Sequence, residues 1–249
     1  MFRGQDVYYR EAIRIWFILA FQAGAINIAG FLACHRFVSH VTGFPTFFAD
    51  DLSKGDLSEA FNILLVPIFF VLGTMLSAWH VDRRIERKKA PRYTLVFSLI
   101  CFMLIFVLLV GQLGYFGVFG EPLLYKRDYA LMAILCAVSG IQNAVITTAS
   151  GYRVRTTHLS GITTDFGIGL VNLWTKRKDK VTFDSELTIN FYRFGTIVSF
   201  TLGGVAGAFA FKSLNYTGFI LPLCTAIFVW RDAELRQRKA LSKQSVPGV

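Results

Sequence analysis

Long runs of apolar residues, separated by short polar segments, make up most of the chain. A helix needs about 20 such residues to cross a bilayer. Runs of suitable length predict transmembrane helices at residues 12–33, 60–80, 93–118, 129–150, 189–211 and 214–230. They are too continuously apolar for the alternating strands of a membrane barrel. The pattern predicts an all-α integral membrane protein with about six transmembrane helices, and the last run, short and containing Pro222, carries the weakest signal.

Composition agrees with this prediction. Of the 249 residues, 54% are hydrophobic and 17% are charged, whereas soluble domains have about 25% charged residues. The charges are concentrated between the apolar runs, so lipid is the expected solvent for most of the chain. The charged N-terminal residues lead directly into an apolar run without a small-residue cleavage site. We therefore expect an uncleaved first helix.

The distribution of Lys and Arg predicts the orientation in the membrane. Placing both termini in the cytoplasm puts twenty of the 26 Lys and Arg residues inside, five outside, and Arg193 within a span. Positive residues accumulate in cytoplasmic loops, so cytoplasmic termini are expected. The basic segments 83–92 and 176–180 directly flank apolar runs, as topology signals do. For this reason the net charge of +10 does not lead us to expect nucleic-acid binding.

The sequence gives little sign of catalytic or metal chemistry. The four cysteines are dispersed in or beside apolar runs, without a CxxC or Cys/His spacing. We also find no nucleophile elbow, HExxH sequence or phosphate-cradling loop. The chain is therefore not expected to be an enzyme, and no cofactor or metal is expected.

An internal repeat is the most informative pattern. Residues 39–46 read SHVTGFPT and residues 157–164 read THLSGITT. The identical positions pair His40 with His158, Gly43 with Gly161, and Thr46 with Thr164.

The same repeat continues on both sides of this motif. Upstream, Gly24-x-x-Asn27 in the first span corresponds to Gly140-x-x-Asn143 in the fourth. Downstream, Gly73-x-x-x-Ser77 in the second span corresponds to Gly203-x-x-x-Gly207 in the fifth, and small residues of this kind predict close helix packing.

The repeat predicts two related halves, residues 1–118 and 119–249, within one membrane domain. Each half has three predicted spans, so the second must enter the membrane in the opposite orientation. Many secondary transporters have such inverted repeats and bind substrate near the midplane between them. A duplication that only produces a stable bundle is the alternative.

A short apolar stretch follows each copy of the motif, at residues 44–52 and 162–174. Each is too short to span the bilayer comfortably. A broken or re-entrant half-helix and a helix lying at the membrane surface are both open.

Polar residues within the apolar runs are the candidates for a binding site, because polar groups in lipid need a partner or a purpose. Asn27, Gln142 and Asn143 either join helices by hydrogen bonds or line a central polar site; we favour the site, since both halves keep the asparagine. His40 and His158 either titrate and couple transport to protons or cap half-helices. The full candidate set for substrate binding is Asn27, His40, Gly43, Gln142, Asn143, His158, Gly161, Asp165 and Arg193.

Arg193 is the one Lys or Arg well inside a predicted span. It either extends to the cytoplasmic interface or pairs with a carboxylate, for which Asp165 is the candidate.

Two signatures resemble those of a known family. Gly24-x-x-Asn27 followed by residues 37–43, and residues 140–143 followed by 156–165, are similar to the signatures of the YoaK-like bacterial membrane proteins, the domain of unknown function 1275. The resemblance implies a six-helix protein of the bacterial inner membrane, whose function is largely uncharacterised and often guessed to be transport. Members commonly carry Asp at the position of Asn27 and Asn at that of Phe44. Their absence here argues against a proton-coupled mechanism with two matched acidic sites.

The function expected from these patterns is small-solute transport by alternating access at a polar site between the two halves. A channel is the nearest alternative, and a structural or sensory membrane protein is a further one. The expected partners are the lipid bilayer and a small polar solute or ion; a homo-oligomer is left open.

Overall fold

The computed structural model describes residues 6–121, 126–150, 159–175 and 179–244. Within these residues every regular element is a helix. The elements in chain order are α1 (Asp6–Cys34), α2 (Gly43–Ser53), α3 (Leu57–His80), α4 (Asp82–Glu86), α5 (Tyr93–Gln112), α6 (Lys126–Ala149), α7 (Leu159–Thr175), α8 (Lys180–Leu214), the 3₁₀ helix η1 (Asn215–Phe219) and α9 (Ile220–Gln244).

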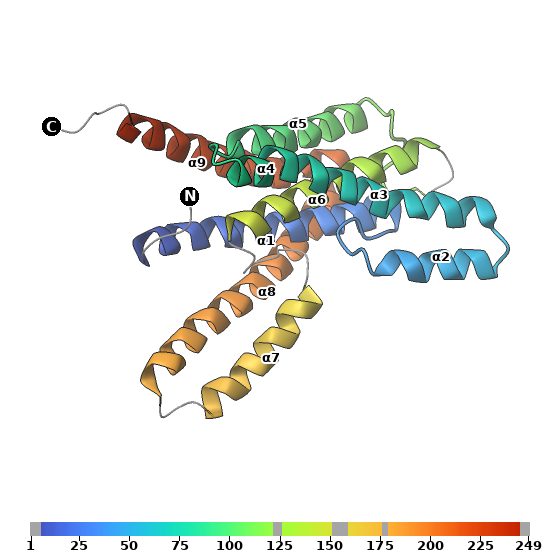
Figure 1. The fold of residues 1–249 in the computed structure, drawn as a ribbon. Helices are drawn as coiled ribbons and strands as arrows, with labels where there is room; N and C mark the ends of the chain where they lie inside the picture. The colour runs from blue at the N-terminus through green and yellow to red at the C-terminus, as the bar shows by residue number, and fades with distance from the viewer. Residues whose placement is uncertain (1–5, 122–125, 151–158, 176–178, 245–249) are drawn as a thin grey trace.

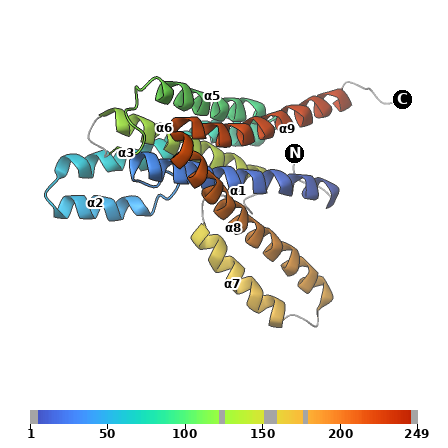
Figure 2. The same cartoon turned by 180° about the vertical axis from the view of Figure 1, so that it is seen from behind.

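Four helices form the centre of the bundle: α1 and α6 contact each other, and α9 and α5 pack over them and against each other (Figure 1). At the sides, α8 packs on α1 and α3 packs on α6. The short helices lie outermost, α2 on α3 and α7 on α8. Figure 2 shows from behind that α7 and the first part of α8 project from the bundle, while α2 lies at its other end.

Helices α1 and α8 cross where glycine brings their backbones together. A Cβ atom added at Gly24 would overlap the carbonyl oxygen of Phe200, and one added at Gly203 would overlap the carbonyl oxygen of Phe21. Both positions therefore require a residue without a side chain. The neighbouring Gly204 has room, since its Cβ would lie 4.0 Å from the nearest carbonyl oxygen, that of Gly24.

Helices α3 and α6 cross in the same manner. A Cβ atom at Gly73 would overlap the carbonyl oxygen of Ala137, and one at Gly140 would overlap that of Phe70. The Thr74 hydroxyl donates to the Gly140 carbonyl at 3.3 Å. The prediction that Gly73 and Gly203 lie on packing faces is confirmed.

Large apolar side chains cover the outside of the bundle as well as its core. Exposed examples on α5, α3 and α8 are Phe102, Leu109, Ile68, Met75, Phe191 and Phe209. Exposed apolar surface on this scale is typical of lipid-facing helices. Among the described residues, five segments are long and apolar enough to cross a membrane, at residues 13–34, 60–86, 93–112, 129–149 and 183–239. The chain thus has the architecture of a multi-pass helical membrane protein.

The helices differ from the predicted spans mainly at their ends. The run 93–118 is helical only to Gln112, because Gly114, Gly117 and Gly120 adopt φ values of 80°, 78° and 84° and turn the chain. The fifth segment, residues 183–239, contains α8, η1 and α9. The run 214–230 begins at the last residue of α8, passes through η1 and becomes α9, in whose first turn Pro222 is tolerated. The short stretches 44–52 and 162–174 are both helical, within α2 and α7.

Candidate functional site

A cleft lies between the pair α1–α6 and the pair α5–α9. Its cavity volume is about 30 Å³, about the space that one water molecule occupies. Its walls are apolar and rich in aromatic rings, and the lining residues are Ile15, Trp16, Leu19, Tyr93, Phe97, Val145, Ile146, Ala149, Val229, Asp232, Ala233 and Arg236. Its apolar, concave lining with a few polar groups is of the kind found in small-molecule sites, but in this state the cleft is much narrower than such sites.

The mouth of the cleft is taken at Ala149 and Arg236, whose neighbours Thr148 and Gln237 bond to Asp82 and Thr94; it therefore lies at the end of the bundle that carries the basic segment 83–92, here called the basic end. Its half-buried lining residues include Ala149, Asp232 and Arg236. The two charged side chains pair with each other, Arg236 Nε lying 2.5 Å from Asp232 Oδ2. The mouth therefore presents a neutral ion pair.

Other polar bonds tie the helices together at the basic end. Thr148 of α6 donates to Asp82 Oδ1 at 2.6 Å, and Thr94 of α5 donates to Gln237 of α9 at 2.7 Å. The side chain of Arg83 lies 3.6 Å over the ring of Trp79, a cation–π contact. These contacts hold the rim around the cleft.

Two buried glutamines lie just beyond the floor of the cleft. Gln142 Nε2 donates to the carbonyl oxygen of Leu19, a lining residue, at 2.6 Å. Gln142 precedes the lining residues Val145 and Ile146 by three and four positions, so it shares their helix face. Gln22 follows Leu19 by one turn on α1. The Oε1 atom of Gln142 and both amide atoms of Gln22 are buried without a hydrogen-bond partner.

At the end of the bundle opposite the basic end, aromatic rings pack together. Phe119 stacks on Phe211 at 5.9 Å between ring centroids, and its ring meets that of Tyr216 edge-on at 5.1 Å. Phe219 packs edge-on against Phe211 at 4.9 Å. The Tyr216 hydroxyl donates to the carbonyl oxygen of Phe116 at 3.3 Å. This aromatic cluster closes the end where α5 stops and α9 starts.

The two asparagines predicted to line a site have different surroundings. Asn27 Oδ1 accepts a hydrogen bond from Ser39 Oγ at 2.8 Å and so fixes the segment between α1 and α2. Asn143 is buried, and its Oδ1 has no hydrogen-bond partner. Neither residue lines the cleft, and Gln142 is the predicted residue bonded to its wall.

The residues of the first motif lie at the start of α2. His40 is exposed, its Nε2 lies 2.6 Å from Thr42 Oγ1, and its ring meets that of Phe37 edge-on. The backbone N–H of Gly43 donates to the His40 carbonyl at 3.1 Å. These contacts make His40 part of the turn that begins α2. Its counterpart His158 lies outside the described residues.

The remaining predicted residues belong to the projecting α7–α8 pair. Gly161 and Asp165 are exposed on α7. Arg193 is half-buried on α8 and donates to Asn190 Oδ1 at 3.1 Å. Asn190 fills the space beside Gly169, where the two helices meet. Arg193 therefore has an amide partner, and the candidate pair with Asp165 is not among the ion pairs found in the described residues.

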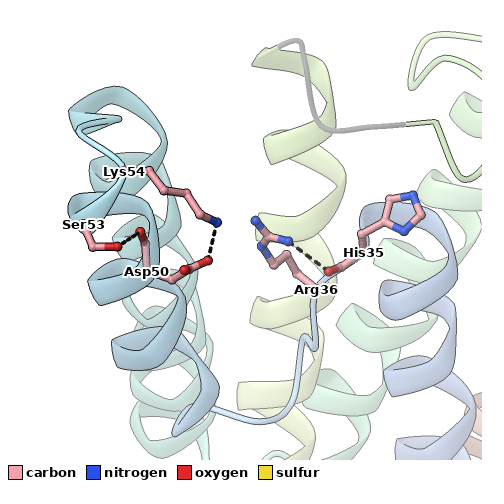
Figure 3. Close-up of polar contacts among 5 residues, drawn as sticks. All are labelled: His35, Arg36, Asp50, Ser53 and Lys54. Atoms are coloured by element: carbon pink, nitrogen blue, oxygen red, sulfur yellow. Dashed lines mark hydrogen bonds and ion pairs between the residues drawn. The ribbon is translucent and has the colours of Figure 1, made fainter.

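A charged group lies at the end of the bundle remote from the cleft mouth (Figure 3). Lys54 Nζ pairs with Asp50 Oδ2 at 2.5 Å, and this hydrogen bond, followed by the Asp50 charge, raises the pKa of Lys54. Arg36 donates to the carbonyl oxygen of His35. The ring nitrogen Nε2 of His35 lies within hydrogen-bond distance of the carbonyl oxygen of Gly120. The Arg36 guanidinium also covers the ring of Phe47 at 4.6 Å. These bonds connect α2 and its preceding segment to the segment after α5.

The described residues contain no group of three His, Cys, Asp or Glu side chains suited to a metal ion. All four cysteines are free thiols.

Sequence reasoning missed most of the cleft. Gln22, which lies beside the cleft and does not line it, could have been found, because it is a polar residue within the first apolar run. Trp16, Tyr93 and Val229 carry no such signal, since an apolar residue facing a cleft and one facing lipid look alike in a sequence.

The fold and cleft define the class as a helical protein with several segments able to cross a membrane. The profile of the family described as "Protein of unknown function (DUF1275)" matches residues 15–230. This is most of the chain, so the chain belongs to that family, as its two signatures led us to expect. No curated protein and no solved structure gives a significant match.

Proposed function

We propose that the chain is a membrane carrier that binds a small solute in the cleft between α1, α5, α6 and α9. The observation that carries the proposal is the difference between the two ends of these helices. At the basic end they leave a cleft, and at the other end aromatic rings fill the space. A site open at one end and closed at the other is what alternating access requires of each state.

Matching contacts in the two halves support an internal repeat. The shift of 116 residues that pairs Gly24 with Gly140 also pairs Phe21 with Ala137. The shift of 130 residues that pairs Gly73 with Gly203 also pairs Phe70 with Phe200. The backbone contact of Gly24 with Phe200 thus has its equivalent in that of Gly140 with Phe70, and the contact of Gly203 with Phe21 has its equivalent in that of Gly73 with Ala137.

The pattern of helix packing supports the same repeat. If α1, α2, α3 and α5 correspond to α6, α7, α8 and α9, then the main helix pairs have observed counterparts, the smaller α3–α5 contact being an exception. The pair α1–α8 corresponds to α3–α6, α2–α3 to α7–α8, and α1–α9 to α5–α6, while α1–α6 and α5–α9 correspond to themselves. Such a pattern fits two halves related by a twofold axis through the centre of the bundle.

In our proposal these halves are residues 1–118 and 119–249, inserted in opposite orientations. The fifth apolar segment, of 57 residues, then contains two crossings, α8 and α9, because about 20 residues suffice for each. The excess of Lys and Arg assigns the basic end to the cytoplasm, so the cleft is open to the inside. By the family resemblance, the membrane is the bacterial inner membrane.

The repeat also identifies the positions that would open in the other state. Ala149 at the cleft mouth corresponds to Ala33 of α1, which is 8% exposed. In an outward-open state Ala33 takes the position at the mouth, and the cleft around Ala149 closes. The buried pair Gln22 and Gln142 lies near the middle of the path between these mouths.

The other predicted site residues have supporting roles in this proposal. Asn27 holds the segment before α2, and Asn143 is the equivalent group in the second half. His40 and His158 precede the short helices α2 and α7 in the chain, and Gly43 and Gly161 lie in the first turns of these helices. Asp165 and Arg193 belong to the α7–α8 pair at the cytoplasmic side.

Flux measurements in reconstituted vesicles test the proposal. We expect uptake of at least one of three labelled probes, nicotinamide, glycine or glycerol, to saturate and to accelerate when the same solute is loaded inside. Ala149→Trp should block this uptake by filling the mouth, and Ala130→Trp, an exposed position on the same helix, should not. Uptake that rises linearly with concentration without exchange would favour a channel. Uptake that Ala149→Trp leaves unchanged would contradict a pathway through the cleft.

A further inference from the structure

The connection between α3 and α5 carries a dense group of positive charges. Six of the ten residues 83–92 are Lys or Arg, and Glu86 is the single acid among them. The exposed basic residues of this loop take part in none of the ion pairs found in the described part of the chain; they are Arg87, Lys88, Lys89 and Arg92. The loop therefore presents positive charge to its surroundings.

Backbone hydrogen bonds give this loop a fixed shape. At the end of α4 the N–H of Lys89 donates to the Arg84 carbonyl at 2.8 Å, and the N–H of Lys88 donates to the Ile85 carbonyl at 2.9 Å. These are the two bonds of a Schellman motif. The N–H of Arg92 donates to the carbonyl oxygen of the last residue of α3 at 3.1 Å. The basic side chains thus extend from an ordered backbone.

Lys88 occupies a position of this motif that favours other residues. Its φ is 54°, in the left-handed region. Gly, and less often Asn, is the usual residue there, because a larger side chain is unfavourable at this φ. Just after α8 the chain follows that preference, with Asn215 at a φ of 50°. At Lys88 the sequence carries a charge where the backbone conformation favours Gly or Asn.

The connection after α8 has the same form without such charges. The five-residue helix η1 follows α8 as the five-residue helix α4 follows α3. Tyr216 and Phe219 of η1 are buried in the aromatic cluster, and the nearest basic residue is Lys212. A short helix can therefore join two long helices in this fold without a basic loop, so the charges of residues 83–92 are not needed for the turn.

Exposed apolar side chains border the charged group. Trp79 in the last turn of α3 is 60% exposed, and Ile85 of α4 is 45% exposed. The guanidinium of Arg83 lies 3.6 Å over the Trp79 ring, so charge and ring are adjacent. Trp near the end of a membrane-crossing helix lies at the level of the lipid headgroups. Basic residues beside such apolar side chains are typical of surfaces that contact anionic lipids.

We infer that the loop 83–92 binds anionic lipids of the leaflet at the basic end. Its Lys and Arg side chains contact the headgroup phosphates, and Trp79 and Ile85 lie at the boundary between headgroups and acyl chains. Charge complementarity selects this partner, because the loop has several exposed cations and one acid. The inference goes beyond the proposed function, since it assigns a second surface and does not depend on transport.

The fluorescence of Trp79 tests the inference on the full chain reconstituted in vesicles. The host lipid is phosphatidylcholine, to which dibrominated phosphatidylglycerol or dibrominated phosphatidylcholine is added as a quencher. The signal is the part of the quenching that Trp79→Phe removes. Both leaflets have the same composition, so the orientation of the chain in the vesicle does not affect the comparison.

We expect the anionic quencher to reach half of its effect at an about tenfold lower mole fraction than the zwitterionic quencher. Sodium chloride at about 1 M should reduce this preference, because it screens exposed charges. Inorganic phosphate at the same ionic strength should reduce it no more than chloride does. A greater reduction would identify a site for phosphate ions and overturn the lipid assignment.

Lys88→Asn separates the charge from the fold. Asn tolerates the positive φ of this position, so the variant should unfold in neutral detergent no more easily than the unaltered chain. Its preference for the anionic quencher should fall by about threefold or more. Arg238→Gln is the matched control, because it removes one positive charge from the same end, but one that already pairs with Glu234 at 2.6 Å. It should keep the preference.

Equal quenching by the two lipids in the unaltered chain would overturn the inference, and this comparison does not require any variant of the loop to fold. An undiminished preference in Lys88→Asn would overturn it as well. Equal losses in Lys88→Asn and Arg238→Gln would show that the preference follows the net charge of the basic end, which would overturn the assignment to the loop.

Discussion

Two adjacent glycines on α8 should respond in opposite ways to the same substitution. A Cβ atom at Gly203 would overlap the backbone of α1 at Phe21, whereas one at Gly204 would make only an ordinary contact, 4.0 Å from the Gly24 carbonyl. Overpacking a close-packed contact typically lowers stability by about 1–3 kcal/mol. Because the obstacle at Gly203 is backbone that cannot rotate away, we expect the upper part of this range.

The helix itself adds a gain at both positions, since Ala is favoured over Gly within a helix by about 1 kcal/mol. Gly203→Ala should therefore lower the free energy of unfolding by about 2 kcal/mol, and Gly204→Ala should leave it unchanged or raise it by up to about 1 kcal/mol. The assay is reversible unfolding of the purified chain in mixed detergent micelles, followed by far-ultraviolet circular dichroism. Equal effects of the two substitutions, or the reverse order, would refute the close crossing of α1 and α8.

Three further outcomes are expected. Gly24→Ala and Gly140→Ala should lower the free energy of unfolding by equal amounts, because each Cβ overlaps an equivalent carbonyl oxygen; unequal losses in the same assay would contradict the repeat. Thr148→Val removes the 2.6 Å hydrogen bond to the carboxylate of α4 and should lower the free energy of unfolding by about 1–3 kcal/mol. Asp50→Asn removes the partner that raises the Lys54 pKa, so Lys54 should lose its proton at lower pH than in the unaltered chain. The rate at which Lys54 reacts with amine reagents near pH 10 should therefore rise, and an unchanged rate would contradict the ion pair.

Much of the fold could be predicted from the pattern of apolar residues. The runs located the central helices, and Gly73 and Gly203 were correctly expected at close helix contacts. Helix ends were less predictable. The run after Gln112 remains apolar while positive-φ glycines turn the chain, and α8 begins at Lys180, well before its apolar run. Helix ends depend on such local backbone geometry and on charged residues that hydropathy alone does not weigh.

The candidate site was harder to predict, for a physical reason. Gln142 stood out because an amide within an apolar run demands a partner, and it does bond to the wall of the cleft. The cleft itself depends on how four helices separate at one end. Trp16 and Tyr93 come to line the same cleft only in the folded bundle, and nothing in their sequence neighbours distinguishes them from lipid-facing residues.

The central claim is that two inverted halves expose one site alternately to the two sides of the membrane. Single cysteines at Ala149 and Ala33, in chains whose four native cysteines are replaced by Ala, test it most directly. A membrane-impermeant thiol reagent is applied to oriented vesicles from either side. The account predicts that Ala149→Cys reacts only from the cytoplasmic side and Ala33→Cys only from the outside. Locking the mouth open with a bulky label on Ala149→Cys should also abolish labelling of Ala33→Cys in the double variant. Reaction of both cysteines from the same side, or of both at once in one molecule, would contradict it.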